Sequence, residues 1–156
     1  MIFATLGTHH DPFPRALDAV LTLAGDAELV VQHGYTDPVA AGPNVRFHQW
    51  LLPDEVDAFF REATLVITHA GVATVVGALR AGHHPIVIPR RKRFGEHVDD
   101  HQMQIVSALT RVGLVTALPD RVGRLRPGSA PRPLAPSPTW PPAGLKVAVR
   151  SSVLGL

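Results

Sequence analysis

Short apolar runs alternate along the first 118 residues with longer segments in which apolar positions recur at helical spacing. Several of the runs are apolar on both faces, which is typical of buried parallel strands. The expected strands are 2–6, 28–32, 65–68, 85–88 and 114–117. The expected helices are 13–23, 54–63, 72–81 and 99–112. Asp54 is expected to cap the second helix, and Gly82 and Gly113 are expected to end the third and fourth.

Strands that alternate with helices through short connections predict an α/β fold, a Rossmann-like, doubly wound parallel sheet. Ligands bind such a sheet at the carboxyl ends of its strands. Residues 68–74 follow one of the buried strands and open a helix with small residues. Bare N–H groups at a helix N-terminus suit a diphosphate, although small residues at such a turn also serve as a packing device.

The composition describes one globular domain with a different tail. The chain has 156 residues, 46% of them hydrophobic, and no cysteine, which excludes disulfides, thiolate metal sites and a cysteine nucleophile. No apolar run reaches the roughly 20 residues of a membrane-spanning helix, and no secretory signal precedes the first strand. Eight of the 15 prolines follow position 118. We therefore expect a domain over 1–118 and an irregular or disordered tail over 119–156.

The net charge of +2 hides an uneven distribution. Residues 1–118 hold nine basic and twelve acidic side chains, a balance of −3, whereas residues 119–156 hold six basic and one acidic side chain, a balance of +5. The expected domain is therefore mildly acidic, and a nucleic-acid partner is not supported. The basic run 91–93 faces either anionic lipid headgroups or water.

Several motifs occur in order along the domain. They are MIFATLGTH at 1–9, THAG at 68–71, RAG at 80–82, PIVIPRR at 85–91 and FGEHVDDHQ at 94–102. Together they resemble the C-terminal domain of the family 28 glycosyltransferases, which are inverting enzymes of the GT-B fold. The run at 94–102 and the N-terminal run are similar to the short catalytic subunit of two-component bacterial exopolysaccharide and capsule transferases. These subunits are related to the catalytic subunit of the transferase that adds GlcNAc to a dolichol-linked sugar.

The resemblance implies half of an enzyme. This domain would bind a UDP-sugar donor, with galactose, glucuronic acid or GlcNAc as its sugar, and would need no cofactor. A membrane-associated subunit would bind the lipid-diphosphate-linked saccharide acceptor. The implied location is cytoplasmic, at the inner face of the plasma membrane, through that partner.

The expected donor-binding residues follow the strand ends. Donors near the diphosphate stabilise the charge that the leaving UDP gains, and the first turn of the helix at 72–81 is well placed for this. Thr8 and His9 would close over the same phosphates. The resemblance places the donor sugar at 100–102, where Gln102 offers a donor and an acceptor, and the uracil ring near Arg90. The full set is Thr8, His69, Gly71, Val72, Ala73, Thr74, Arg90, Glu96, His97, Asp100, His101 and Gln102.

His9 is the candidate catalytic base, with the alternative that it only orders its loop and the partner supplies the base. Two positions depart from the family pattern: Ala73 stands where many members have Gly, and Gly77 where many have a ribose-binding Glu. Gly77 favours a second hypothesis, a nucleotide-binding subunit without activity. A third is a metal hydrolase at 96–101, where His97 and His101 are four residues apart, although no metalloprotease motif is present and no metal is expected.

Overall fold

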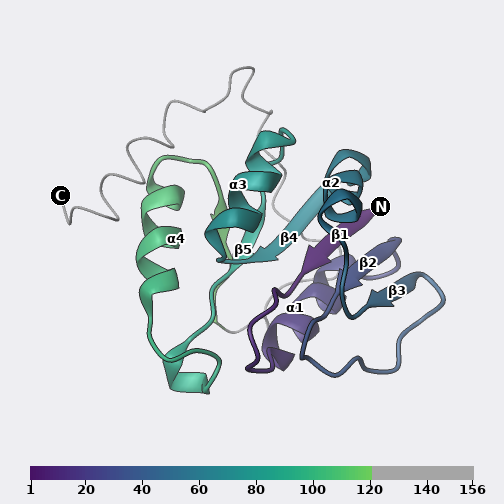
Figure 1. Ribbon diagram of the computed structural model, residues 1–156, viewed down its shortest axis with the longest axis horizontal. Coiled ribbons are helices and arrows are strands. Elements are labelled where there is room, and N and C mark those ends of the chain that lie inside the picture. The colour runs from purple at the N-terminus through teal and green to yellow at the C-terminus, as the bar shows by residue number, and fades with distance from the viewer. Residues whose placement is uncertain (121–156) are drawn as a thin grey trace.

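A computed structural model describes residues 1–120 as one parallel sheet with helices on both faces (Figure 1). The strands are β1 (Ile2–Thr5), β2 (Leu29–Gln32), β3 (Val45–His48), β4 (Leu65–His69), β5 (Ile86–Ile88) and β6 (Thr116–Ala117). The helices are α1 (Pro14–Ala24), α2 (Pro53–Glu62), α3 (Val72–Arg80) and α4 (His101–Arg111), with a 3₁₀ turn η1 (Lys92–Phe94). The strand order is β3-β2-β1-β4-β5-β6, which confirms the predicted fold class.

β1 lies at the centre of the sheet because it pairs in parallel with both β2 and β4. Its first residue, Ile2, is in register with Leu29 and Leu65, and its last, Thr5, with Gln32 and Thr68. All residues of β1, β2 and β5 are buried, as their apolar runs predict. The carboxyl ends of the central strands therefore finish level, at one edge of the sheet.

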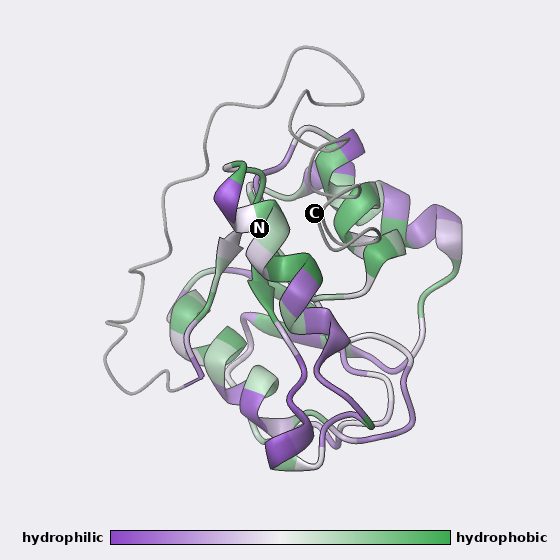
Figure 2. Ribbon diagram, turned by 90° about the vertical axis from the view of Figure 1, so that its left-hand side faces the viewer, coloured by the Kyte–Doolittle hydropathy of each residue, from purple (hydrophilic) through white to green (hydrophobic). Residues whose placement is uncertain are grey.

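Alternate residues of the strands face opposite sides of the sheet, and buried residues form three core clusters. On one face, α1 packs on a cluster that includes Ala4, Val31 and Ile67. On the other face, α2 and α3 cover a cluster that includes Phe3 and Val66, and α3 and α4 share a third cluster. Hydrophobic colour in Figure 2 is concentrated in the strands and the helix faces turned toward them, while the loops at the lower end of the molecule are largely hydrophilic.

The predicted strands and helices are confirmed, with one strand missed. β3 was not expected because it is an edge strand in which Arg46 is exposed and the other residues are only partly buried, so no continuous apolar run marks it. The predicted cap at Asp54 is wrong. Leu52 precedes the first residue of α2, and the Glu55 carboxylate accepts the Leu52 N–H.

The two predicted helix ends are confirmed. Gly82 and Gly113 have φ values of 88° and 69°, and each directly follows the last turn of its helix. The predicted domain of 1–118 lies almost wholly within the described range, whereas the expected tail from 121 onward lies outside it. Among the described helices, none has the length and hydropathy of a bilayer-crossing segment.

Candidate donor-binding site

The topological switch point of the sheet lies between β1 and β4. From β1 the strand order runs outward through β2 to β3, and from β4 it runs outward the other way through β5 to β6. Loops that leave the two strands diverge there and open a crevice, which is the usual ligand position in such sheets. The loop after β1 carries Gly7, Thr8 and His9, and β4 runs through His69 into Gly71 and α3. The structure thus brings these predicted residues to one edge.

Three glycines make a strip of close backbone contacts along this edge. A Cβ on Gly34 would lie 2.4 Å from the Gly7 carbonyl oxygen and 3.6 Å from the Trp50 ring. A Cβ on Gly7 or on Gly71 would lie 2.7 Å or 2.2 Å from Nε2 of His69. Since Cβ atoms cannot approach so closely, the His69 ring occupies the space that side chains at 7 and 71 would need.

His69 is neutral at neutral pH. Burial and the nearby Arg90 guanidinium lower its pKa to about 4, although the Thr5 carbonyl acts in the opposite direction. Its Nδ1 atom is buried and has no hydrogen bond of normal geometry within residues 1–120. A buried polar atom without a hydrogen-bond partner lowers the stability of the fold, so such an atom at a ligand crevice suggests a functional role.

The N-terminus of α3 differs from those of the other helices. At or beside the start of each other helix, a side-chain oxygen accepts a hydrogen bond from a backbone N–H. Thr36 accepts from Phe13 at α1, Glu55 from Leu52 at α2, and Asp99 from His101 at α4. Across the described residues, no side chain accepts an N–H at the start of α3, its first turn holds no acid, as in α1 and α4, and Val72 and Ala73 are exposed. Its first N–H groups are therefore left to an external acceptor.

Arg90 is one of the most buried side chains of the molecule, at 1% exposure. Its guanidinium donates to the carbonyls of Leu6, Asp11 and Glu96 and lies 4.5 Å from the centre of the Phe13 ring. Sequence reasoning expected this side chain to contact a nucleotide. The structure instead commits it to the loops on either side of the crevice, so Arg90 is a positioning residue.

Glu96 is also buried rather than turned toward a ligand. Its carboxylate binds the Arg15 guanidinium of α1 at 2.8 Å and accepts the Arg91 N–H at 2.9 Å. The two contacts fix the segment that follows β5 against α1. A buried carboxylate held in this way is not free for a metal ion, which removes one ligand from the hydrolase hypothesis at 96–101.

His9 lies on the rim of the crevice and touches the segment after β5. Its ring centroid is 4.8 Å from that of His97 and 4.5 Å from that of His10. Burial, Arg90 and the neighbouring histidines lower its pKa, so the imidazole is neutral near pH 7 and able to accept a proton. The two loops that carry predicted site residues thus meet at His9 and His97.

The segment 99–102 is arranged differently from its prediction. His97 and His101 do not share a helix face, because α4 begins at His101; each lies beside a different oxygen of Asp99. The Gln102 side-chain oxygen accepts the Arg90 N–H at 3.0 Å, which uses one of its two lone pairs, so its NH₂ group is the more available partner for a sugar hydroxyl. Asp100 accepts the Lys92 N–H and is otherwise exposed.

Gly77 packs against α2. A Cβ at this position would lie 2.9 Å from the Phe60 ring, so the ring fills the space that a carboxylate side chain would need. This glycine is explained by helix packing.

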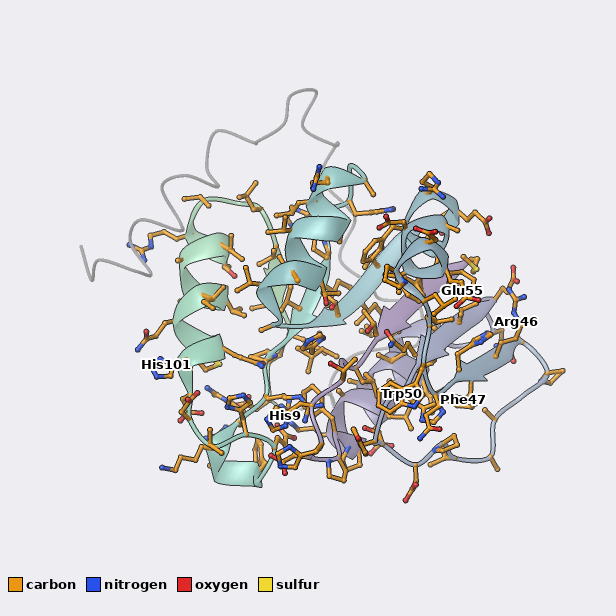
Figure 3. The ribbon with its side chains drawn as sticks, viewed as in Figure 1. His9, Arg46, Phe47, Trp50, Glu55 and His101 are labelled. Atoms are coloured by element: carbon orange, nitrogen blue, oxygen red, sulfur yellow. The ribbon has the colours of Figure 1, made fainter. Side chains whose placement is uncertain are left out.

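Two exposed aromatic side chains at the same edge were missed by sequence reasoning. Tyr35 and Trp50 follow β2 and β3, and their rings meet edge to face with centroids 5.2 Å apart. Trp50 is 45% exposed although it is large and apolar. Figure 3 shows Trp50 and His101 on opposite sides of His9. The missed strand β3 explains why Trp50 was not placed at the edge.

Comparison with known proteins identifies the class that this fold and edge define. Residues 15–118 match the glycosyltransferase family 28 C-terminal domain, and the chain belongs to this family. The motifs at 68–71, 80–82 and 85–91 that suggested the family lie within the matched range.

Individual relatives agree with this assignment. The chain is 37% identical over 75 residues to the UDP-N-acetylglucosamine transferase subunit ALG13 of Yarrowia lipolytica, covering 47% of this chain and 36% of that protein. Its fold is shared with the glycosyltransferase SnogD from Streptomyces nogalater (TM-score 0.57, 24% identity, 97% of this chain and 38% of that one). It is also shared with the glycotransferase of kitacinnamycin (TM-score 0.54, 20% identity, 82% of this chain and 32% of that one). The chain spans about a third of the length of each relative.

Proposed function

We propose that the chain is the donor-binding subunit of an inverting glycosyltransferase, and that the diphosphate of a UDP-sugar binds at the N-terminus of α3. The uncapped first turn of α3 at the switch point carries the proposal. Its N–H groups and the Thr74 hydroxyl supply hydrogen bonds to phosphate oxygens, and the helix dipole supplies positive potential. Both effects strengthen as UDP leaves and its charge grows.

The glycine strip and His69 define the floor beneath the phosphates. Gly7 and Gly71 lack side chains where the His69 ring packs between them, so the loop after β1 and the start of α3 both lie against this ring. The imidazole is neutral, so it offers either a donor or an acceptor nitrogen without adding charge. Thr8 is exposed at the next position and is placed to close over the same group.

The two ends of the donor extend from this centre in opposite directions. Trp50 offers an exposed aromatic face beside Gly34, which suits the stacking of a uracil ring. His97, Asp100, His101 and the Gln102 NH₂ group are the groups proposed to select the sugar. His9, on the rim between the two loops, is the proposed base for the acceptor hydroxyl.

The chain spans only about a third of its relatives, so we propose that a second, membrane-associated chain completes the enzyme. That subunit would bind a lipid-diphosphate-linked saccharide and hold this chain at the inner face of the plasma membrane. The similarity to a transferase subunit supports this arrangement. The dipole and N–H groups of α3 would neutralise the leaving diphosphate, so we expect transfer to require no metal cofactor.

Calorimetric titration of the purified chain with UDP, UDP-galactose, UDP-glucuronic acid and UDP-GlcNAc tests the proposal. We expect binding that EDTA leaves unchanged, with one sugar nucleotide preferred. Gln102→Ala should weaken binding of that sugar nucleotide more than binding of UDP. Gln104→Ala, an exposed glutamine on the same helix, is the matched control.

Absence of binding to every nucleotide, both alone and after addition of the acceptor subunit, would refute the proposal. Nucleotide binding without transfer in the complete complex would support the alternative of a non-catalytic nucleotide-binding subunit.

A further inference from the structure

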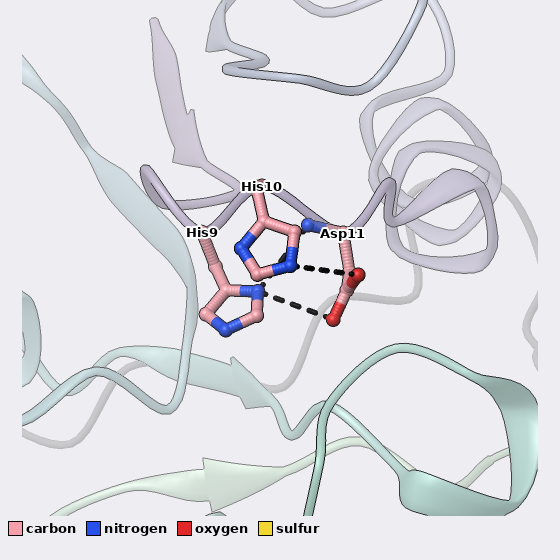
Figure 4. Close-up of side chains that lie close together, drawn as sticks. All are labelled: His9, His10 and Asp11. Atoms are coloured by element: carbon pink, nitrogen blue, oxygen red, sulfur yellow. Dashed lines mark hydrogen bonds and ion pairs between the residues drawn. The ribbon is translucent and has the colours of Figure 1, made fainter.

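We propose that His9, His10 and Asp11 form a binding site for a divalent transition-metal ion, with Zn²⁺ as its representative. The three residues follow one another in the loop after β1, and one ligand atom from each lies within 4.8 Å of the others. Figure 4 shows both imidazole rings beside the Asp11 carboxylate. The metal site goes beyond the proposed transfer reaction and does not depend on it.

The ligand atoms lie close enough together to share one ion. Nδ1 of His9 is 3.4 Å from Oδ2 of Asp11, and Nε2 of His10 is 3.4 Å from Oδ1. Nitrogen and oxygen ligands that each lie about 2.0–2.2 Å from zinc are separated from one another by roughly 3.3–3.5 Å. A charge-assisted hydrogen bond would instead bring the atoms to about 2.7–2.9 Å. The two distances involve different oxygens of Asp11, so they suit an ion that both carboxylate oxygens bind, with one imidazole nitrogen beside each oxygen.

The direction of one lone pair gives a second argument. The Asp11 backbone N–H donates to Nδ1 of His9 at 3.3 Å, so Nδ1 is the unprotonated ring nitrogen, and this long hydrogen bond uses its single lone pair. Nδ1 and the carboxylate oxygen 3.4 Å away are two acceptors without a shared proton, and an ion bound by both would replace the hydrogen bond. A cation between them satisfies both, and imidazole nitrogens favour zinc, nickel or copper over magnesium.

A second cluster of the same residue types is a weaker candidate. His97 and His101 flank Asp99, but among the described residues these three do not bring one ligand atom each within 4.8 Å of one another. The side chain of His10 is 75% exposed, so an ion can reach it. His10 and His101 have nearly the same exposure, 75% and 73%, and each lies beside one aspartate. They therefore form a matched pair for mutation.

Zinc titration of the full chain, free of any histidine tag, tests the site. Calorimetry should show one Zn²⁺ per chain, reversed by EDTA, and no heat with Mg²⁺. His10→Ala and Asp11→Asn should each lower the zinc affinity by at least about tenfold, while His101→Ala leaves it unchanged. Equal affinity in His10→Ala, or a loss confined to His101→Ala, would overturn the site. Far-UV circular dichroism of each variant confirms that the fold is retained.

The consequence for activity rests on the proposed function. An ion on Nδ1 of His9 holds the ring against Asp11, beside the crevice, so zinc should inhibit transfer in the complete enzyme and His10→Ala should relieve the inhibition. Zinc binding without inhibition would leave the metal site standing and count against His9 as the base. UDP titration without zinc tests the donor site separately.

Discussion

His69 connects packing with chemistry at the centre of the site. Its ring fills the space between Gly7 and Gly71, so its size dictates that both neighbours lack side chains. The same burial keeps it neutral, together with the charge of Arg90. A neutral imidazole in this position leaves the positive potential of the α3 N-terminus as the main attraction for a phosphate.

The lowered pKa of His69 predicts acid sensitivity. The unfolded chain binds a proton at this histidine near pH 6.5, but the folded chain does so only near pH 4. The free energy of unfolding should therefore fall as pH drops from about 6.5 to about 4, by roughly 2–3 kcal/mol from this residue. Urea unfolding of the native chain and of His69→Gln at pH 7 and pH 5 measures it. Equal losses in both proteins would contradict the assignment.

Alanine substitutions at two glycines with positive φ distinguish the effect of a steric clash from that of backbone strain. Gly7 has a φ of 85° and Gly113 a φ of 69°, but a Cβ meets His69 only at Gly7 and nothing within 4 Å at Gly113. Gly113→Ala should cost about 1 kcal/mol of stability from backbone strain alone. Gly7→Ala should cost at least twice as much and should also weaken UDP binding. Equal destabilisation in thermal unfolding would show that His69 moves freely.

At the scale of elements, hydrogen bonds and an ion pair of buried charged side chains join segments that the sheet does not connect. Arg90 ties the segment after β5 to the loop after β1, and Glu96 ties it to α1 through Arg15. These contacts hold the two loops whose rings meet at His9 and His97. The relative position of the loops around the crevice thus depends on Arg90 and Glu96, two side chains that the sequence had suggested as ligand contacts.

Neutralising Glu96 should loosen this arrangement. Glu96→Gln keeps the shape of the side chain but leaves Arg15 without its partner in a largely buried setting, which should cost about 2–4 kcal/mol. Glu28→Gln breaks the exposed pair with Arg46 and should cost less than about 1 kcal/mol. Chemical denaturation compares the two variants. Similar midpoints would mean that the Arg15 contact is not stabilising.

The sequence predicted the elements that have a clear hydrophobic periodicity and missed those that depend on contacts with other parts of the fold. The doubly apolar strands and the amphipathic helices were found because burial on both faces, or on one stripe, leaves a pattern. β3 was missed because an edge strand is only half buried, and Trp50 was missed with it. Asp54 was misjudged because the carboxylate of Glu55 reaches back to Leu52, which spacing alone does not distinguish.

Side-chain direction limited the prediction of the site. The strand ends and the α3 N-terminus were located correctly as positions, since parallel topology brings them to one edge. Whether Arg90, Glu96 and Gln102 point to a ligand or to the backbone depends on contacts between segments up to 84 residues apart. No local pattern contains that information.

At the scale of the whole molecule, the proposed role of the chain is that of a donor-side half. It matches the family over residues 15–118 and spans about a third of its relatives. We therefore expect the purified chain to bind a UDP-sugar but to transfer none of it to a lipid-linked acceptor. Addition of the acceptor subunit should restore transfer of a radiolabelled sugar, and His9→Ala in that complex should lower its rate at least tenfold. Transfer by the chain alone would contradict the division into two subunits.

The most direct test of the central claim is backbone NMR of the isotope-labelled chain during titration with UDP. A diphosphate bound at the switch point should shift the amide signals of 71–74 first and those of 7–9 and 34 with them. Amides at the opposite edge of the sheet, such as those of Gly25 and Gly82, should stay in place. Shifts confined to that opposite edge, or no shifts at millimolar UDP, would contradict a donor site at the N-terminus of α3.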